Sequence, residues 1–149
     1  MSSIVTFLDV IRHGEPEGGE VFRGRTDHRL TDNGRRQFQQ RLDRNPGNWQ
    51  RVVSSPLSRC SESAELVAGQ SDLPLHIDER WAEIDYGDWE NVPIKEIMSA
   101  EQTHVRQLWE DPMNFCAPGG ETVGQLQSRV LEGWTHILEQ HAGQHTLIV

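Results

Sequence analysis

The chain has 149 residues and a mass of 17.0 kDa, and this length predicts one domain spanning residues 1–149. Its 14 cationic and 23 acidic residues give a formal net charge of −9. This charge repels phosphate backbones and anionic lipids, which disfavours nucleic acid and membrane surfaces as partners. All but one of the cationic residues are arginine, the better side chain for two-point binding of phosphate. A local anion site is therefore compatible with the acidic background.

The cysteines and the apolar segments exclude several classes of protein. Cys60 and Cys116 show neither zinc-ligand spacing nor a disulfide framework, and Cys60 is expected to be a small buried residue. The longest apolar run, residues 4–11, contains Asp9 and is too short to span a membrane. No basic start or small-residue cleavage site of a signal peptide is evident. We therefore expect a cytoplasmic protein.

Strands and helices alternate in the first half of the chain. Residues 4–11 are β-branched and almost continuously apolar, which predicts a buried strand of a parallel sheet. A helix is expected over residues 31–44 and a second strand over residues 51–54. Ser55 followed by proline is a strong helix-start signal, and that helix should end at Gly69.

The second half continues the alternation. A third strand is predicted over residues 73–78, followed by a long loop over residues 79–93. Apolar residues recur at helical spacing over residues 94–109 and 123–141, and a fourth strand begins at residues 146–149. The pattern predicts an α/β fold, a three-layer sandwich with a mostly parallel central sheet and helices on both faces. Because such a strand usually leads into another helix, we expect the C-terminal part of the fold to be missing.

Polar residues and turn formers follow the first strand directly, where parallel sheets bind ligands. The neutral imidazole of His13 can attack phosphorus while the guanidinium of Arg12 binds phosphoryl oxygens. Gly14 leaves room for the backbone to approach an anion. The alternative is a loop histidine that pairs with Glu15, and the tetrapeptide alone does not decide between the two.

A second group of candidate residues follows the strand at residues 51–54. Arg59 is expected in the first turn of the next helix, where free N–H groups and the helix dipole favour an anion. The alternative is a surface Arg59 that pairs with Glu62 or Glu65, a common interaction of little energetic value.

The loop at residues 81–90 is dense in carboxylates and aromatic side chains. Hydrolysis of a phosphate monoester needs an acid that protonates the departing alkoxide. On composition alone, any of four carboxyl groups could do this: Glu83, Asp85, Asp88 or Glu90. The alternative is a solvated acidic loop with tryptophan side chains packed underneath.

Taken in order, these motifs resemble those of the histidine phosphatase (phosphoglycerate mutase-like) superfamily. The matching segments are Arg-His-Gly-Glu at 12–15, Arg-Gly at 23–24, Leu-Thr-Asp-Asn-Gly at 30–34, Ser-Ser-Pro-Leu-Ser-Arg at 54–59, the loop at 83–89, and Pro-Gly-Gly-Glu-Thr at 118–122. The series covers nearly the whole chain, which makes the resemblance specific. It implies a phosphate monoester hydrolase that acts through a phosphohistidine intermediate.

The resemblance also implies a role for each matching position. His13 would be the nucleophile that becomes phosphohistidine, and Arg12 and Arg59 would bind the phosphoryl group. Glu83 would donate a proton to the leaving group and later act as the base that activates water. The resemblance implies no metal and no cofactor, because such a site works mainly by stabilising the charge of the phosphoryl group.

Other matching positions border the expected pocket. Arg23 and Gly24 match a family loop near the substrate. Gly120 and Glu121 match the start of a helix beside the pocket, and no catalytic role is implied for them.

The spacing and the amino-acid sequence of the loops bear on the substrate. Only 36 residues separate Glu83 from Gly120, where family mutases carry a long insertion. Residues 86–90 resemble the phosphatase branch, in particular the enzymes that hydrolyse α-ribazole 5′-phosphate in cobalamin biosynthesis. Broad-specificity phosphatases of sugars or small metabolites share much of this pattern.

The expected partner is a small phosphorylated metabolite, and the oligomeric state is open, a dimer being one option. Arg25 and Arg29 either reach a second anionic group of that substrate or are solvated.

The sequence departs from the family at its end. The family continues the last strand into a Ser/Thr-His-Gly turn, whose histidine is a second phosphate ligand and would follow Val149. Loss of one such donor typically lowers the rate by roughly 10²–10³. Three hypotheses follow: a C-terminally shortened active phosphatase, which we favour, a truncated form with weak activity, or a phosphate-ligand binding protein without turnover.

Overall fold

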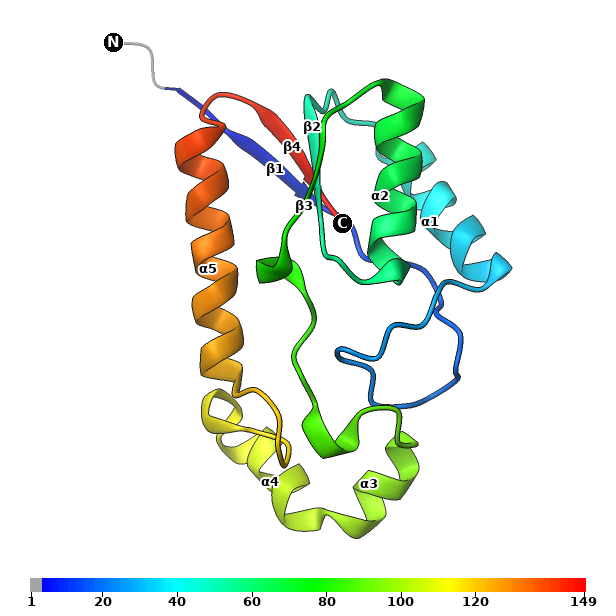
Figure 1. The fold of residues 1–149 in the computed structure, drawn as a ribbon, viewed down its shortest axis with the longest axis vertical. Helices are drawn as coiled ribbons and strands as arrows, with labels where there is room; N and C mark the ends of the chain where they lie inside the picture. Colours follow the sequence, from blue (N-terminus) through cyan, green and yellow to red (C-terminus); the bar gives the residue numbers. More distant parts are fainter. Residues whose placement is uncertain (1–3) are drawn as a thin grey trace.

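The computed structural model describes residues 4–149 and has a four-stranded parallel sheet at its centre. The strands are β1 (Phe7–Val10), β2 (Arg51–Ser54), β3 (Leu75–Ile77) and β4 (His145–Ile148), in the spatial order β1-β4-β2-β3. Because all neighbouring strands are parallel, their carboxyl ends meet at one edge of the sheet. The loops that carry the predicted chemistry leave from this edge (Figure 1).

Helices cover both faces of the sheet, which confirms the predicted three-layer α/β fold. The helices are α1 (Asp32–Arg44), α2 (Ser58–Ser71), α3 (Ile94–Ala100), α4 (Gln102–Glu110) and α5 (Val123–Gln140). Figure 1 shows α1 and α2 on one side of the sheet and α5 on the other, with α3 and α4 beyond its carboxyl edge. Among residues 4–149, none of the helices has the length and apolar character needed to cross a membrane.

The alternation of side chains along β2 explains the two faces. Val52 packs in the cluster that α1 and α2 form with the sheet, around Phe38. Its neighbour Val53 points to the other face and packs with Ile137 of α5. Both valines are almost completely buried. Burial of this apolar area on both sides of a single strand is the main force that holds the layers together.

The start of one helix follows its local sequence, and the start of the next does not. The hydroxyl group of Thr31 caps α1 by accepting the N–H of Gly34, as the predicted boundary requires. The helix predicted to start at Ser55 in fact starts at Ser58. The Ser55 N–H donates instead to the carbonyl oxygen of Val149, which extends the strand pairing by one residue.

The cap of α2 comes from a distant loop. The Asp27 carboxylate accepts hydrogen bonds from the backbone N–H and the hydroxyl group of Ser58, both at 2.7 Å. This helix also continues through Gly69 and ends at Ser71, with Asp72 in the left-handed conformation. The predicted stop at Gly69 was therefore wrong by about half a turn.

Other departures concern the edge strand and the helical segment after residue 93. The predicted buried strand over residues 4–11 is shorter, and β1 lies at the edge of the sheet, where Phe7 is 56% and Val10 69% exposed. Within residues 4–149 it pairs with β4 alone. Residues 94–109 form two helices rather than one, because the chain leaves helical geometry at Glu101.

Candidate active site

The turn after β1, residues 11–15, is called the histidine turn below. It packs directly on the start of α1, where a Cβ atom added to Gly14 would lie 1.9 Å from the carbonyl oxygen of Gly34. From the same helix, the Arg41 guanidinium donates hydrogen bonds to the carbonyl oxygens of Arg12 (2.8 Å) and His13 (3.0 Å). Packing on α1 and the hydrogen bonds from Arg41 thus fix the backbone of this turn.

The imidazole of His13 is held in one tautomer. Its Nδ1 lies 2.6 Å from the carbonyl oxygen of Gly14, and since a carbonyl can only accept, Nδ1 carries the proton. Nε2 therefore keeps its lone pair. Burial lowers the pKa of His13, and the positive charges of Arg59 and Arg12 lower it further, although the Gly14 hydrogen bond opposes them. The structure thus presents a neutral imidazole with a free nucleophilic nitrogen.

The alternative pairing of His13 with Glu15 is not what the structure contains. The Glu15 carboxylate instead accepts hydrogen bonds from the side chains of Thr31 (3.0 Å) and Asn33 (2.9 Å). These contacts lower the pKa of Glu15, so the carboxylate belongs to the start of α1 rather than to the histidine.

Arg59 lies in the first turn of α2, as predicted, and is buried, with 2% of its surface exposed. Its guanidinium donates to the carbonyl oxygens of Thr26 (3.0 Å) and Gly24 (2.8 Å). The alternative, a surface Arg59 that pairs with Glu62 or Glu65, is wrong, because Arg59 is buried and Glu62 pairs with Arg29. A buried guanidinium with donors to spare is a strong site for an anion.

The segment that Arg59 contacts is held on its other side by Glu90. The Glu90 carboxylate accepts the backbone N–H groups of Arg25 (2.8 Å), Thr26 (2.8 Å) and Tyr86 (3.0 Å). Burial opposes its ionisation, but these hydrogen bonds and that of the Thr26 hydroxyl outweigh it and lower the pKa of Glu90. Gly24 packs here as well: a Cβ atom on it would lie 1.8 Å from the carbonyl oxygen of Ile84.

Residues 79–90 are called the carboxylate loop below. The carboxyl groups of this loop differ in what they face. Glu83 is exposed and lines two cavities, of about 390 and 220 Å³, together with His13 and Arg59. The other three candidates line neither cavity. Asp85 accepts the N–H of Gly87 at 2.8 Å, and the Glu90 carboxylate is occupied by the backbone N–H groups named above. Of the four carboxyl groups that composition allowed, the structure therefore brings only Glu83 to the histidine.

The larger cavity gathers most of the predicted side chains. Its walls combine charged side chains with apolar and aromatic ones, and they are formed by Arg12, His13, Pro16, Gly19, Glu20, Val21, Phe22, Arg23, Arg59, Glu83, Tyr86 and Ile94. Gly24 is absent from this wall, since it is buried under the carboxylate loop. Arg25 and Arg29 also line neither cavity, which argues against their contact with a second anionic group.

Arg23 is fixed in the cavity wall by its own loop. Its Nε–H donates to Nδ1 of His28 (3.0 Å), and its Nη2 donates to the carbonyl oxygens of Glu17 (2.7 Å) and Gly19 (2.8 Å). Arg29 pairs with Glu62 at the surface, outside this network. The structure thus places Arg23 beside the candidate nucleophile and leaves Arg29 away from it.

Two arginines that hold the site were missed in the sequence. Arg41 binds the histidine turn, and Arg129 of α5 donates to the carbonyl oxygens of Ala82 (2.6 Å) and Glu83 (3.1 Å) in the carboxylate loop. Arg41 lies three residues after Phe38 and is exposed, and Arg129 lies three residues after Leu126 and is half-buried. Neither lies on the fully buried face of its helix, so helical periodicity gives no signal for them.

The thiol of Cys60 lies beside the smaller cavity but has the character of a packing residue, as expected. It is 9% exposed, and burial raises its pKa to about 11, which keeps the thiol protonated near neutral pH. In the part of the chain that the structure describes, no three His, Cys, Asp or Glu side chains are grouped so as to hold a metal ion.

Comparisons with known proteins bear on the family to which the chain belongs. The histidine phosphatase superfamily (branch 1) matches residues 8–149. Phosphoserine phosphatase 1 of Hydrogenobacter thermophilus is 28% identical over 147 residues, which are 95% of this chain and 69% of the relative. A probable phosphoglycerate mutase, GpmB, of Salmonella choleraesuis is 30% identical over 94% of this chain and 66% of its own length.

A solved structure extends the comparison to the fold. The alpha-ribazole phosphatase of Shigella flexneri superimposes with a TM-score of 0.81 and 28% identity, over 95% of this chain and 72% of that one. The chain spans about two thirds of the length of the curated relatives named above. The motifs, the fold and the match over residues 8–149 lead to one conclusion: the chain belongs to the histidine phosphatase superfamily, branch 1.

Proposed function

We propose that this protein hydrolyses phosphate monoesters through a phosphohistidine at His13. One observation carries the proposal: His13, whose Nε2 keeps its lone pair, the buried Arg59 and Glu83 all line the same two cavities. Nucleophile, anion binder and proton donor are the three groups that phosphoryl transfer to a histidine requires. Membership of the superfamily supports the same chemistry.

In the first step Nε2 of His13 attacks phosphorus, and the bond from phosphorus to the ester oxygen breaks. The carboxylic acid of Glu83 gives its proton to that oxygen, which leaves as the alcohol. Arg12 and Arg59 stabilise the charge on the transferring phosphoryl oxygens. The phosphorylated ring is positively charged, and the Gly14 carbonyl, which accepts the Nδ1–H at 2.6 Å, stabilises it.

In the second step water replaces the alcohol. The Glu83 carboxylate takes a proton from the water, whose oxygen attacks phosphorus while the bond between phosphorus and nitrogen breaks. Inorganic phosphate leaves, His13 regains its lone pair, and Glu83 is again the acid. Each group returns to its starting state, so the cycle needs no further reactant. We expect a chelator such as EDTA to leave turnover unchanged, since none of these steps uses a metal.

The cavity bears on the substrate. Its volume of about 390 Å³ suits a small metabolite, and Phe22 and Tyr86 meet edge to face in its wall at 5.1 Å between ring centroids. Such a wall suits a leaving group with an apolar or aromatic part, as in α-ribazole 5′-phosphate. The likeness to the Shigella alpha-ribazole phosphatase supports this substrate. The second candidate is broad specificity for small phosphorylated metabolites, which Arg23 in the cavity wall would serve equally.

The test is hydrolysis of an aryl phosphate by the 149-residue chain. We expect turnover that His13→Ala abolishes and that His76→Ala, which removes an exposed histidine of β3, leaves unchanged. Binding of inorganic phosphate without hydrolysis by the unaltered chain would contradict the proposal. That result would favour the hypothesis of a binding protein, whereas slow turnover lost in His13→Ala would favour a weakly active form.

A further inference from the structure

Arg129 uses every N–H group that it has. Its Nε and Nη2 donate to the two carboxylate oxygens of Glu121, at 2.6 and 2.8 Å. Its Nη1 donates to the carbonyl oxygens of Arg80 (2.9 Å) and Ala82 (2.6 Å), and Nη2 donates a second bond to that of Glu83 (3.1 Å). Five donors therefore meet five acceptors, and three of these belong to successive parts of the carboxylate loop.

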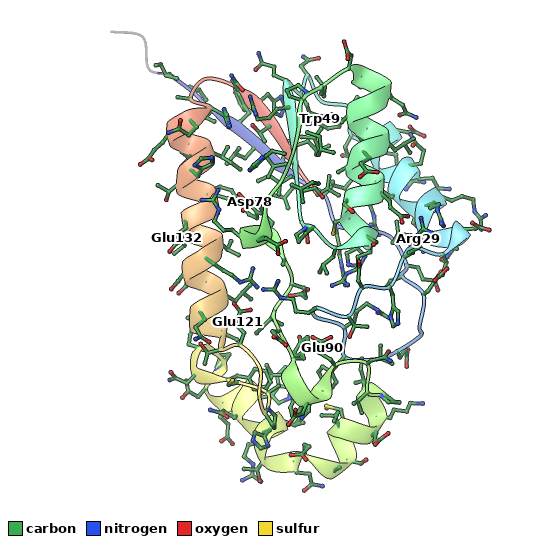
Figure 2. The ribbon with its side chains drawn as sticks, viewed as in Figure 1. Arg29, Trp49, Asp78, Glu90, Glu121 and Glu132 are labelled. Atoms are coloured by element: carbon green, nitrogen blue, oxygen red, sulfur yellow. The ribbon has the colours of Figure 1, made fainter. Side chains whose placement is uncertain are left out.

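The ion pair that orients this guanidinium is largely buried. The side chains of Arg129 and Glu121 are 17% and 14% exposed. The hydrogen bonds from Arg129 lower the pKa of Glu121, so this carboxyl group stays ionised and the pair stays charged. Figure 2 shows Glu121 beside the amino-terminal end of α5, facing the carboxylate loop. A two-point ion pair of this kind fixes the plane of the guanidinium as well as its position.

The carboxylate loop has few internal means of fixing Glu83. The residue lies between two short 3₁₀ turns, Glu79–Trp81 and Gly87–Trp89, outside any strand or α-helix. Its side chain is exposed, and its carboxylate accepts a hydrogen bond only from the N–H of its neighbour Ile84, at 2.8 Å, among the contacts of residues 4–149. The direction of the side chain thus depends on the backbone to which Arg129 binds.

We propose that Arg129, oriented by Glu121, is a positioning residue that places the carboxyl group of Glu83 at the leaving-group oxygen. The inference rests on the proposed function, because it assigns to Glu83 the proton transfer of the first step. Arg129 itself lines neither cavity, so it acts through the backbone of Glu83 and not on the substrate.

The test compares kcat/KM for two substrates that differ in their leaving group. An alkyl phosphate needs a proton donor for its poor leaving group, whereas an aryl phosphate with an acidic phenol does not. We expect Arg129→Gln to lower kcat/KM for the alkyl phosphate by about 10²-fold and for the aryl phosphate by only a few fold. The ratio kcat/KM reports the first step alone, since phosphoryl transfer to His13 releases the alcohol.

The chain offers a matched control in Arg41. It too binds carbonyl oxygens near the cavity, but those of Arg12 and His13 in the histidine turn. We expect Arg41→Gln to lower kcat/KM for both substrates by a similar factor, because it disturbs the nucleophile and not the acid. Equal losses for both substrates in Arg129→Gln would overturn the proposal and reduce Arg129 to a residue that only stabilises the fold.

Glu83→Gln separates this proposal from the proposed function. If Glu83→Gln shows no selective loss on the alkyl phosphate, then the acid role itself fails. If Glu83→Gln is selective and Arg129→Gln is not, then only the positioning role fails. With the proposal correct, Arg129→Gln adds little further loss in the Glu83→Gln background, since neighbouring groups that act together are not additive.

A second variant and a second readout cover a failure of Arg129→Gln to fold. Glu121→Gln keeps the Arg129 donors but weakens their orientation, and we expect the same selectivity with a smaller amplitude. Amide hydrogen exchange gives a readout without turnover: the N–H of Asp85, which donates to Glu121 at 3.3 Å, should exchange faster in Glu121→Gln and not in Arg41→Gln. Unchanged exchange together with unchanged selectivity would contradict the proposal.

Discussion

The histidine turn and the carboxylate loop reach the same cavities by different means. His13 stands three residues after the end of β1, and its backbone rests on the adjacent α1. Glu83 stands six residues after the end of β3, in a segment held by side chains from elsewhere. Arg129 and Glu121 hold it from outside the loop, and Glu90 of the loop itself accepts the N–H of Tyr86; Figure 2 shows Glu121 and Glu90 apart from each other.

The difference shows two ways to give a reactive group a fixed position. A strand end supplies a rigid backbone whose direction the sheet determines, so a short motif is enough. A loop away from the sheet must bring charged partners that occupy its carbonyl and N–H groups. The histidine turn is therefore sensitive to packing on α1, and the carboxylate loop is sensitive to the loss of single buried charges.

The largest effect should come from Arg59, which serves both regions. Arg59 lines both cavities, and its guanidinium donates to the carbonyl oxygens of Gly24 and Thr26. We expect Arg59→Gln to lower kcat/KM by roughly 10²–10³, for alkyl and aryl phosphates alike, because phosphoryl charge develops with either leaving group. Inhibition by inorganic phosphate should weaken in parallel. Unchanged inhibition by inorganic phosphate would show that Arg59 only supports the loop that contains Gly24 and Thr26.

A smaller effect distinguishes the two regions by their glycines. A Cβ atom on Gly24 would lie 1.8 Å from the carbonyl oxygen of Ile84, so Gly24→Ala must displace the carboxylate loop. We expect it to lower the free energy of unfolding by about 1–3 kcal/mol. Gly69→Ala is the control: apart from the backbone of its own helix, no atom lies within 4 Å of its added Cβ, and in the last turn of α2 it should stabilise by at most about 0.5–1 kcal/mol. Denaturant unfolding measures both, and a neutral Gly24→Ala would refute the close packing.

The smallest effect is a shift of a titration midpoint in the histidine turn. Burial and the charges of Arg59 and Arg12 hold the pKa of His13 below its ordinary value of 6.5. An NMR titration of the imidazole should therefore show a midpoint below 6.5. The native state binds this proton more weakly than the unfolded chain does, so protonation costs stability as the pH falls from 6.5 through the native midpoint. A midpoint at or above 6.5 would contradict a desolvated, neutral His13.

The contrast between the two regions also explains how far the sequence could be interpreted. The position of Arg59 in the first turn of α2 and the cap of α1 depend on neighbours within a few residues. Such features are visible in short motifs. Among the carboxyl groups, composition left four candidates open, because the choice of Glu83 depends on which one faces His13 across the fold.

What the sequence could not indicate are contacts between distant segments. Asp27 accepts the N–H of Ser58 where α2 starts, and no pattern near residue 58 predicts a cap 31 residues away. Arg129 looks like an ordinary helical arginine until its carbonyl partners are known. The exposure of β1 was missed because β-branched residues favour a strand and do not tell whether it lies at an edge or in the centre.

The central claim is that His13 carries the phosphoryl group between the two steps. The direct measurement is rapid mixing of the chain with a radiolabelled aryl phosphate, quenching in alkali, and mapping of the labelled residue by mass spectrometry. The account predicts an acid-labile, alkali-stable phosphate on His13, absent from His13→Ala and present in His76→Ala. Turnover with no such phosphoenzyme, or with phosphate on another residue, would contradict it.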